Sequence, residues 1–172
     1  MGFLVVVGMG LILTLTEVPG APVGQNTCNR VSQRIPGMLR ELRTEFQTYE
    51  HLYDIDTDNL LLESYISQEF NGVLACQGVS DLMQFYLHDV MPQVESQNPK
   101  SVDLIRPLKE KLYSFRKIIR KCYKFLFCEF KNPATDEVKH KFIQLGDTGG
   151  IKAMSEFGVF LNYLELYLSN NA

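Results

Sequence analysis

Apolar residues recur every three or four positions along most of the chain, the spacing that places them on one face of an α-helix. Such a stripe runs through each of six segments, and no segment shows a convincing alternation of the kind that a β-strand needs. The clearest stripes begin near Met38, Val73, Ile105, Val138 and Ile151. The pattern predicts an all-α bundle built around about four long helices.

Prolines and glycines indicate where these helices begin and end. Pro36 is expected in the first turn of the first helix, and Pro92 is expected to end the third. Gly146 is expected to close the fifth helix, and the glycine pair at 149–150 predicts a hinge-like break before the last one. A shorter second helix is expected over residues 60–70.

The segment 151–168, IKAMSEFGVFLNYLELYL, carries the densest apolar stripe. Its apolar residues fall at helical spacing and predict a face that packs into the core: Ala153, Phe157, Phe160, Leu161, Leu164, Tyr167 and Leu168. The polar residues Lys152, Ser155, Asn162 and Glu165 fall away from this stripe. We expect them at the surface, either simply exposed to solvent or as part of a face that another protein binds.

The N-terminal segment is apolar from Phe3 to Leu15. This run is shorter than the roughly 20 residues that a membrane-spanning helix needs, and it is typical of a secretory signal peptide. No basic residue precedes the run, so the terminal amine alone supplies positive charge there. We expect a signal peptide over 1–20 and a secreted, extracellular domain over 21–172, without membrane insertion.

The chain contains four cysteines, Cys28, Cys76, Cys122 and Cys128. An even number in a secreted chain favours two disulfides. Cys122 and Cys128 are not expected to pair, because six residues of helix separate them by about 9 Å, and a disulfide needs Cα atoms within about 7 Å. The other two connectivities remain open on this argument. The cysteine spacing is not that of a zinc site, and no metal or cofactor is expected.

Charge and motifs narrow the class of protein. The 172 residues carry a formal net charge of −3, which gives no electrostatic reason to expect nucleic acid as a partner. No Gly-rich phosphate loop, HExxH or GxSxG motif occurs, so we do not expect an enzyme. A row of basic residues lies in the segment whose apolar stripe begins near Ile105. It is interpreted as a solvated helix face or, alternatively, as a weak binding surface for sulfated polysaccharide: Arg116, Lys117, Arg120, Lys121 and Lys124.

Long ordered blocks of sequence add to the periodicity. MLRELRTEF, DNLLLES, CQGVSDLMQFYLHDVMPQVESQNP, KCYKFLFCEF and IKAMSEFGVFLNYLELY resemble, in this order, parts of the first, second, third, fourth and last helices of the interleukin-10 family. The resemblance extends from about Cys28 to Leu168. On these blocks the chain is similar to an interleukin-10 cytokine, either a host protein or a viral mimic of one.

The resemblance implies a class II helical cytokine, a six-helix bundle that forms a domain-swapped, intertwined homodimer. The last two helices of each chain would complete the bundle of the other, with the polar stretch EFKNPATDE as the linker. The implied disulfides are Cys28–Cys122 and Cys76–Cys128. The implied partners are the alpha and then the beta chain of the interleukin-10 receptor, with JAK-STAT signalling and suppression of inflammatory cytokine synthesis.

The family's alpha-chain surface uses the first helix, the loop after it and the last helix. By matching position, the resemblance implies receptor-binding roles for Arg40, Arg43, Asp58, Lys152, Ser155, Glu156 and Glu165. Two positions on this surface depart from the family: Gly158 stands where the family has an acid, and Glu50 stands where it has a lysine. A receptor-binding antagonist with weak signalling therefore remains an alternative to an active cytokine.

Overall fold

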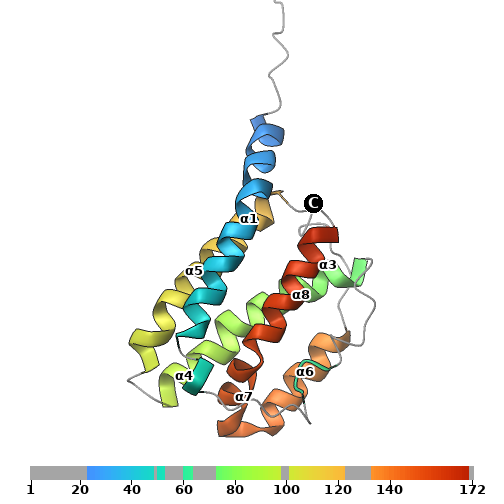
Figure 1. Ribbon diagram of the computed structural model, residues 1–172. Coiled ribbons are helices and arrows are strands. Elements are labelled where there is room, and N and C mark those ends of the chain that lie inside the picture. Colours follow the sequence, from blue (N-terminus) through green and yellow to red (C-terminus); the bar gives the residue numbers. More distant parts are fainter. Residues whose placement is uncertain are drawn as a thin grey trace, which may run out of the picture.

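The computed structural model describes residues 23–48, 50–52, 60–63, 73–97, 101–122 and 133–170. Every regular element in these ranges is a helix (Figure 1), which confirms the predicted all-α fold. The expected signal peptide, Asp58, Cys128 and most of the predicted second helix lie outside the described residues. The side chains of Cys28, Cys76 and Cys122 are not described either, so the disulfide pairing stays a prediction.

Helices α1 (Val23–Gln47) and α5 (Ser101–Cys122) pack side by side (Figure 1). At the edge of this contact, Lys111 Nζ lies 3.8 Å from the Glu41 carboxylate and 3.3 Å from that of Glu45. Each helix turns one apolar stripe inward. The predicted stripes are confirmed by the buried residues Leu39, Leu42 and Phe46 in α1 and Ile105, Leu108, Leu112, Phe115 and Ile119 in α5, and Ile35 extends the first stripe beyond its predicted start.

Pro36 does not open the first helix, contrary to the expectation from its position. It lies inside α1, which begins at Val23. A proline removes one backbone N–H and therefore one intrahelical hydrogen bond. Pro36 is exposed, and the buried neighbours Ile35 and Leu39 hold this turn against the core. Tertiary packing thus outweighs the local cost of the proline.

The centre of the bundle is a long helical run from Val73 to Gln97. It consists of α3 (Val73–Phe85), a π-helical turn (Tyr86–Val90) and α4 (Met91–Gln97). The run contacts α5 and the three last helices, so it is apolar on more sides than its predicted stripe. Three fully buried side chains lie off that stripe: Leu82, Phe85 and Met91.

Pro92 does not end this helical run, which is a second departure from expectation. A proline lacks the N–H, and its ring clashes with the carbonyl four residues earlier, here that of His88. Just before the proline, the N–H of Met91 donates to the carbonyl of Tyr86, five residues back. This π turn widens the helix at the point of the clash, and the helix then continues to Gln97.

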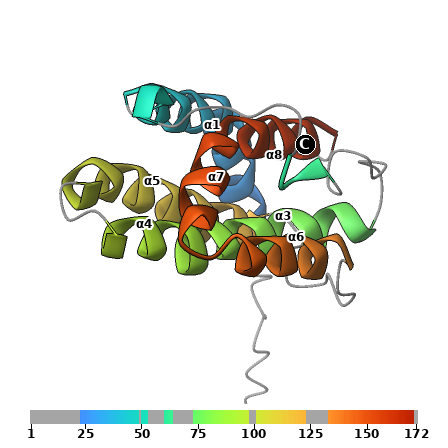
Figure 2. The ribbon, with the colours of Figure 1, turned by 90° about the horizontal axis from the view of Figure 1, so that it is seen from below.

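The last part of the chain forms α6 (Pro133–Gln144), a 3-10 turn (Gly146–Thr148), α7 (Gly149–Ser155) and α8 (Phe157–Asn170). α6 contacts α3, α7 contacts the π turn and α4, and α8 contacts α1 and α3 (Figure 2). Because α6 starts at Pro133, the second half of the expected linker is the first helical turn. Residues 123–132 lie outside the described part of the chain, and exchange of α6–α8 between two chains stays a prediction.

The glycines at the corner between α6 and α7 allow close packing. Gly146 has φ of 54°, the left-handed conformation that closes α6 as predicted. A Cβ on Gly149 would lie 2.8 Å from the carbonyl oxygen of Phe142, and a Cβ on Gly150 would lie 2.9 Å from Cγ2 of Val94. Both glycines are buried. The hinge expected at 149–150 is therefore wrong, because α7 starts where only glycine fits between its neighbours.

Gly149→Ala is expected to lower the free energy of unfolding by about 1–3 kcal/mol, because the new methyl group meets a backbone oxygen. Gly158→Ala is the matched control. A Cβ there would lie 3.6 Å from Cε1 of Phe46, an ordinary contact, and alanine is the better helix former. Denaturant unfolding followed by circular dichroism measures both. A Gly149→Ala protein as stable as the parent would contradict the close-packing argument.

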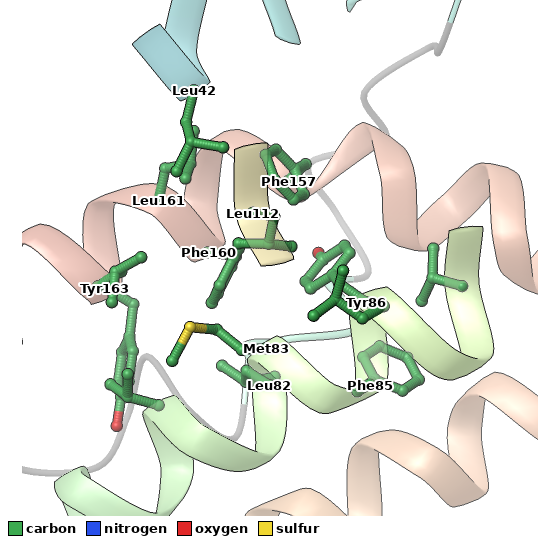
Figure 3. Close-up of a cluster of buried hydrophobic side chains, with 14 of the residues drawn as sticks. Leu42, Leu82, Met83, Phe85, Tyr86, Leu112, Phe157, Phe160, Leu161 and Tyr163 are labelled. Carbon is green, nitrogen blue, oxygen red and sulfur yellow. The ribbon is translucent and has the colours of Figure 1, made fainter. Parts of the chain in front are cut away.

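Aromatic rings fill the core where the central run meets α8 (Figure 3). The ring of Tyr86 stacks on Phe160 with centroids 4.9 Å apart and meets Phe157 edge-on at 5.0 Å. Phe46 of α1 lies 5.2 Å from Phe157, so one cluster joins three helices. The predicted core stripe of the last segment is confirmed, since all its members are buried: Ala153, Phe157, Phe160, Leu161, Leu164, Tyr167 and Leu168.

Candidate functional site

Three of the expected binding residues lie along the line where α1 meets α8. Arg43 on α1 donates through one guanidinium nitrogen to the Glu165 carboxylate and through another to Oδ1 of Asn162, at 2.9 Å. Arg40 lies one turn earlier on α1 and is exposed, as are Asn162 and Glu165. We call these four residues the α1–α8 seam. It brings together side chains about 120 positions apart in the chain.

The local sequence explains why these polar side chains border the seam. Arg43 follows the buried Leu42 in α1, and Asn162 and Glu165 each follow a buried leucine in α8. Asn162 was expected at the surface, but the family resemblance did not single it out as a receptor-binding residue; it lies three positions from Glu165 and therefore on the same helix face. An exposed ion pair of this kind adds little to stability. Its main consequence is a half-exposed guanidinium held in one orientation.

The remaining described candidates lie at the junction of α7 and α8, and two of them are buried. Ser155 is 4% exposed, and its hydroxyl donates to the carbonyl of Lys152 at 2.7 Å. Glu156 is 0% exposed. The expectation that both are surface residues is therefore wrong. The helix breaks at Glu156, where φ is −95° and ψ is 7°, so the helical spacing of one segment does not carry into the next.

The buried carboxylate of Glu156 accepts two backbone hydrogen bonds. Oε1 accepts from the N–H of Leu61 at 2.7 Å, and Oε2 accepts from the N–H of Leu62 at 2.8 Å. Lys152 Nζ lies 3.4 Å from Oε1. These donors supply the partners that a buried charge requires. We call Glu156, Lys152 and the Leu61–Leu62 backbone the Glu156 cluster; it ties the α7–α8 junction to a turn 94 positions earlier.

Tyr86 lies next to this cluster and stays neutral. Its hydroxyl donates to the carbonyl of Ala153 at 2.9 Å. Burial, and in second place the charge of Glu156, raises the pKa of Tyr86 well above its ordinary value. The tyrosine therefore remains a hydrogen-bond donor at physiological pH and holds α7 against the central run.

Two further positions on the last helices, Lys152 and Gly158, are less exposed than a typical surface residue. The Lys152 side chain is only 16% exposed. Gly158 is half-buried, and a Cβ there would touch the ring of Phe46 on α1. The position where the family resemblance places an acid thus borders the contact between α8 and α1.

The basic row on α5 forms a separate charged feature. Arg116, Lys117 and Arg120 line, with Tyr113, a hollow of about 200 Å³. Nε of Arg116 is buried without a hydrogen-bond partner, and burial, followed by the charge of Arg120, lowers the pKa of Arg116. The side chains of the last two members of the row, residues 121 and 124, lie outside the described part.

Within the described ranges, no helix combines the length and the apolar character needed to cross a bilayer. In the same part of the chain, histidine, cysteine and acidic side chains do not gather into a group of three or more that could hold a metal ion.

Comparison with known proteins places this arrangement in a family. Residues 10–170 match the family model described as Interleukin 10. Interleukin-10 of Equus caballus is 40% identical over 147 residues, which cover 84% of this chain and 83% of the relative. Interleukin-10 of Cervus elaphus is 41% identical over 144 residues, which cover 83% and 80%. With the all-helical fold, these matches show that the chain belongs to the interleukin-10 family and is a cytokine, not an enzyme.

Proposed function

We propose that this chain is a secreted immunosuppressive cytokine that binds the alpha chain and then the beta chain of the interleukin-10 receptor. Through JAK-STAT signalling it would inhibit the synthesis of inflammatory cytokines. The observation that carries the proposal is the α1–α8 seam, where Arg43 pairs with Glu165 and the exposed Arg40 lies one turn earlier on α1. Membership of the interleukin-10 family supports it, and the expected signal peptide over 1–20 supports secretion.

The seam has properties that suit a specific protein partner. Arginine is enriched among the residues that dominate interface energies, and its planar fork can bind a carboxylate through two hydrogen bonds. Arg43 is already oriented by Glu165 and Asn162, so less side-chain freedom is lost on binding. Asp58 and Lys152 remain proposed contacts. Ser155 and Glu156 are not proposed as direct contacts, because neither offers exposed surface.

The test combines binding with signalling. The mature protein is passed over immobilised alpha chain, and phosphorylation of the receptor's transcription factor is measured in cells that carry both receptor chains. We expect saturable binding and phosphorylation. Binding without phosphorylation would favour the antagonist instead. Salt-sensitive retention on heparin without receptor binding would favour the polysaccharide alternative, which would act through the basic row of α5.

We also propose that the active form is a domain-swapped homodimer. The last three helices bury apolar side chains against α1 and the central run Val73–Gln97. The same contacts can form with a second chain if the connection over 123–132 spans the two bundles. Light scattering at micromolar concentration should give twice the mass of one chain. Insertion of several residues within 129–132 should yield monomers, since the helices can then fold back. A monomeric parent protein would contradict the swap.

A further inference from the structure

Two elements, α7 and the turn at Leu61–Leu62, meet at one buried carboxylate. Lys152 approaches it from α7 at 3.4 Å, Glu156 itself ends that helix, and the N–H groups of Leu61 and Leu62 reach it from a separate turn. Because Glu156 is 0% exposed, a partner protein cannot touch it while the junction is folded. Lys152 retains some exposure, at 16% of its side chain. The carboxylate therefore lies directly behind a residue that a partner can reach.

We propose that Glu156 is a positioning residue for receptor binding, which acts through Lys152 and the Leu61–Leu62 turn without touching the receptor. The proposal rests on the proposed function, because it assumes that Lys152 is part of the receptor-binding surface. It deepens that function by assigning a role to a residue that has no exposed surface of its own.

The physical reason lies in the freedom of a lysine side chain. Its ammonium ends a flexible four-carbon stem and can occupy many positions in solvent. The Glu156 carboxylate restrains it, because the two residues are four positions apart and their charges face each other in a poorly solvated place. The same carboxylate fixes the backbone of Leu61 and Leu62. One charge thereby ties the position of Lys152 on α7 to that of the Leu61–Leu62 turn.

Glu156→Gln removes this charge with almost no change in volume. The amide keeps one acceptor oxygen, but its NH₂ group would face an N–H donor of the turn, so one of the two backbone hydrogen bonds is lost. Lys152 also loses the opposite charge that lies 3.4 Å from its ammonium, so this restraint on its position is removed. The receptor would then meet a displaced ammonium and a looser turn.

A double-mutant cycle separates positioning from a purely structural role. The affinity for the alpha chain is measured by surface plasmon resonance, well below every unfolding midpoint, for the parent, Glu156→Gln, Lys152→Met and the double variant. We expect each single change to weaken binding about tenfold, and the double variant to lose clearly less than the product of the two single losses, because coupled residues are not additive. Tyr86→Phe is the comparison variant: it removes the nearby hydrogen bond to Ala153 but keeps the charge of Glu156 and its bonds to the turn, so it should lose less affinity than Glu156→Gln.

The amides of the turn provide a readout that needs no receptor. Hydrogen exchange at Leu61 and Leu62 should accelerate in Glu156→Gln, while the amides of α5 keep their protection. If Glu156→Gln does not fold, Glu156→Asp, which keeps the charge on a shorter side chain, takes its place in both measurements.

Three results would overturn the inference. The first is an affinity of Glu156→Gln equal to that of the parent. The second is an equal loss of affinity when Glu156→Gln is introduced into the parent and into Lys152→Met. The third is unchanged hydrogen exchange at Leu61 and Leu62. If the parent binds the alpha chain and Glu156→Gln binds it equally well, this inference fails and the proposed function still stands. A parent that does not bind the alpha chain overturns the proposed function, and this inference with it.

Discussion

Glu156→Leu is expected to lower the free energy of unfolding by about 3–5 kcal/mol. The leucine fits a buried position, but it leaves the N–H groups of Leu61 and Leu62 without an acceptor inside the protein. Each unsatisfied buried donor costs about 1–3 kcal/mol. Lys152 also loses the carboxylate that neutralises it in a poorly exposed place. For a domain of this size the melting temperature should fall by roughly 10 °C.

Glu165→Leu is the matched control, because it removes an exposed carboxylate from the same part of the chain. That carboxylate is paired with Arg43 and is 57% exposed, and exposed pairs contribute at most about 1 kcal/mol. Calorimetry or denaturant unfolding at one protein concentration compares the two variants. If both variants lose the same free energy of unfolding, the hydrogen bonds of Glu156 contribute less to stability than expected.

Arg43→Glu is expected to weaken alpha-chain binding by about 2–5 kcal/mol. The substitution removes a guanidinium held by Asn162 and places a second acid beside Glu165. Arg43→Ala, which removes the group without adding repulsion, should cost about 1–3 kcal/mol. Stability should change much less than affinity, since the ion pair lies at the surface. Surface plasmon resonance measures affinity, and thermal unfolding measures stability.

Arg106→Glu supplies the control for charge reversal. Arg106 is an exposed arginine on α5 whose partner is Asp103, at 3.3 Å in the same helix, and it lies outside the seam. Its reversal should leave affinity within about 0.5 kcal/mol of the parent. Equal losses for Arg43→Glu and Arg106→Glu would indicate a general charge effect. Parental binding by Arg43→Glu would show that the seam is not the receptor site.

Periodicity was sufficient to predict most of the helices that the structure describes and most of the core, but not the start of α1 at Val23. The apolar positions around Leu42, Leu112 and Phe160 repeat at the spacing of a helix, and each is buried. This works because a helix that buries one face needs apolar residues on that face, whatever the partner helix is. In the central run, Val73–Gln97, the apolar stripe did not predict all of the buried residues, because Phe85 and Met91 are buried although they lie off the predicted face. A helix with neighbours on several sides has no single buried face.

Proline and glycine rules were less reliable, because they describe the isolated chain. Pro36 and Pro92 each lie within a longer helical run than their positions predicted. Packing of adjacent residues or a π turn overcomes the missing hydrogen bond. Gly149 predicted a hinge but is a close contact with the backbone of Phe142. That contact is made by another helix, so local sequence does not reveal it.

The sequence by itself determined the all-α class, the family resemblance and the apolar faces of the helices, because each depends on residue order or on spacing within one segment. It also selected Arg43 and Glu165, but not their contact. Only the tertiary structure decided that Glu156 and Ser155 are buried. Glu156 turns inward because its partners, the N–H groups of Leu61 and Leu62, come from a turn 94 and 95 positions away. A polar residue is exposed or buried according to such distant donors, and helical spacing carries no information about them.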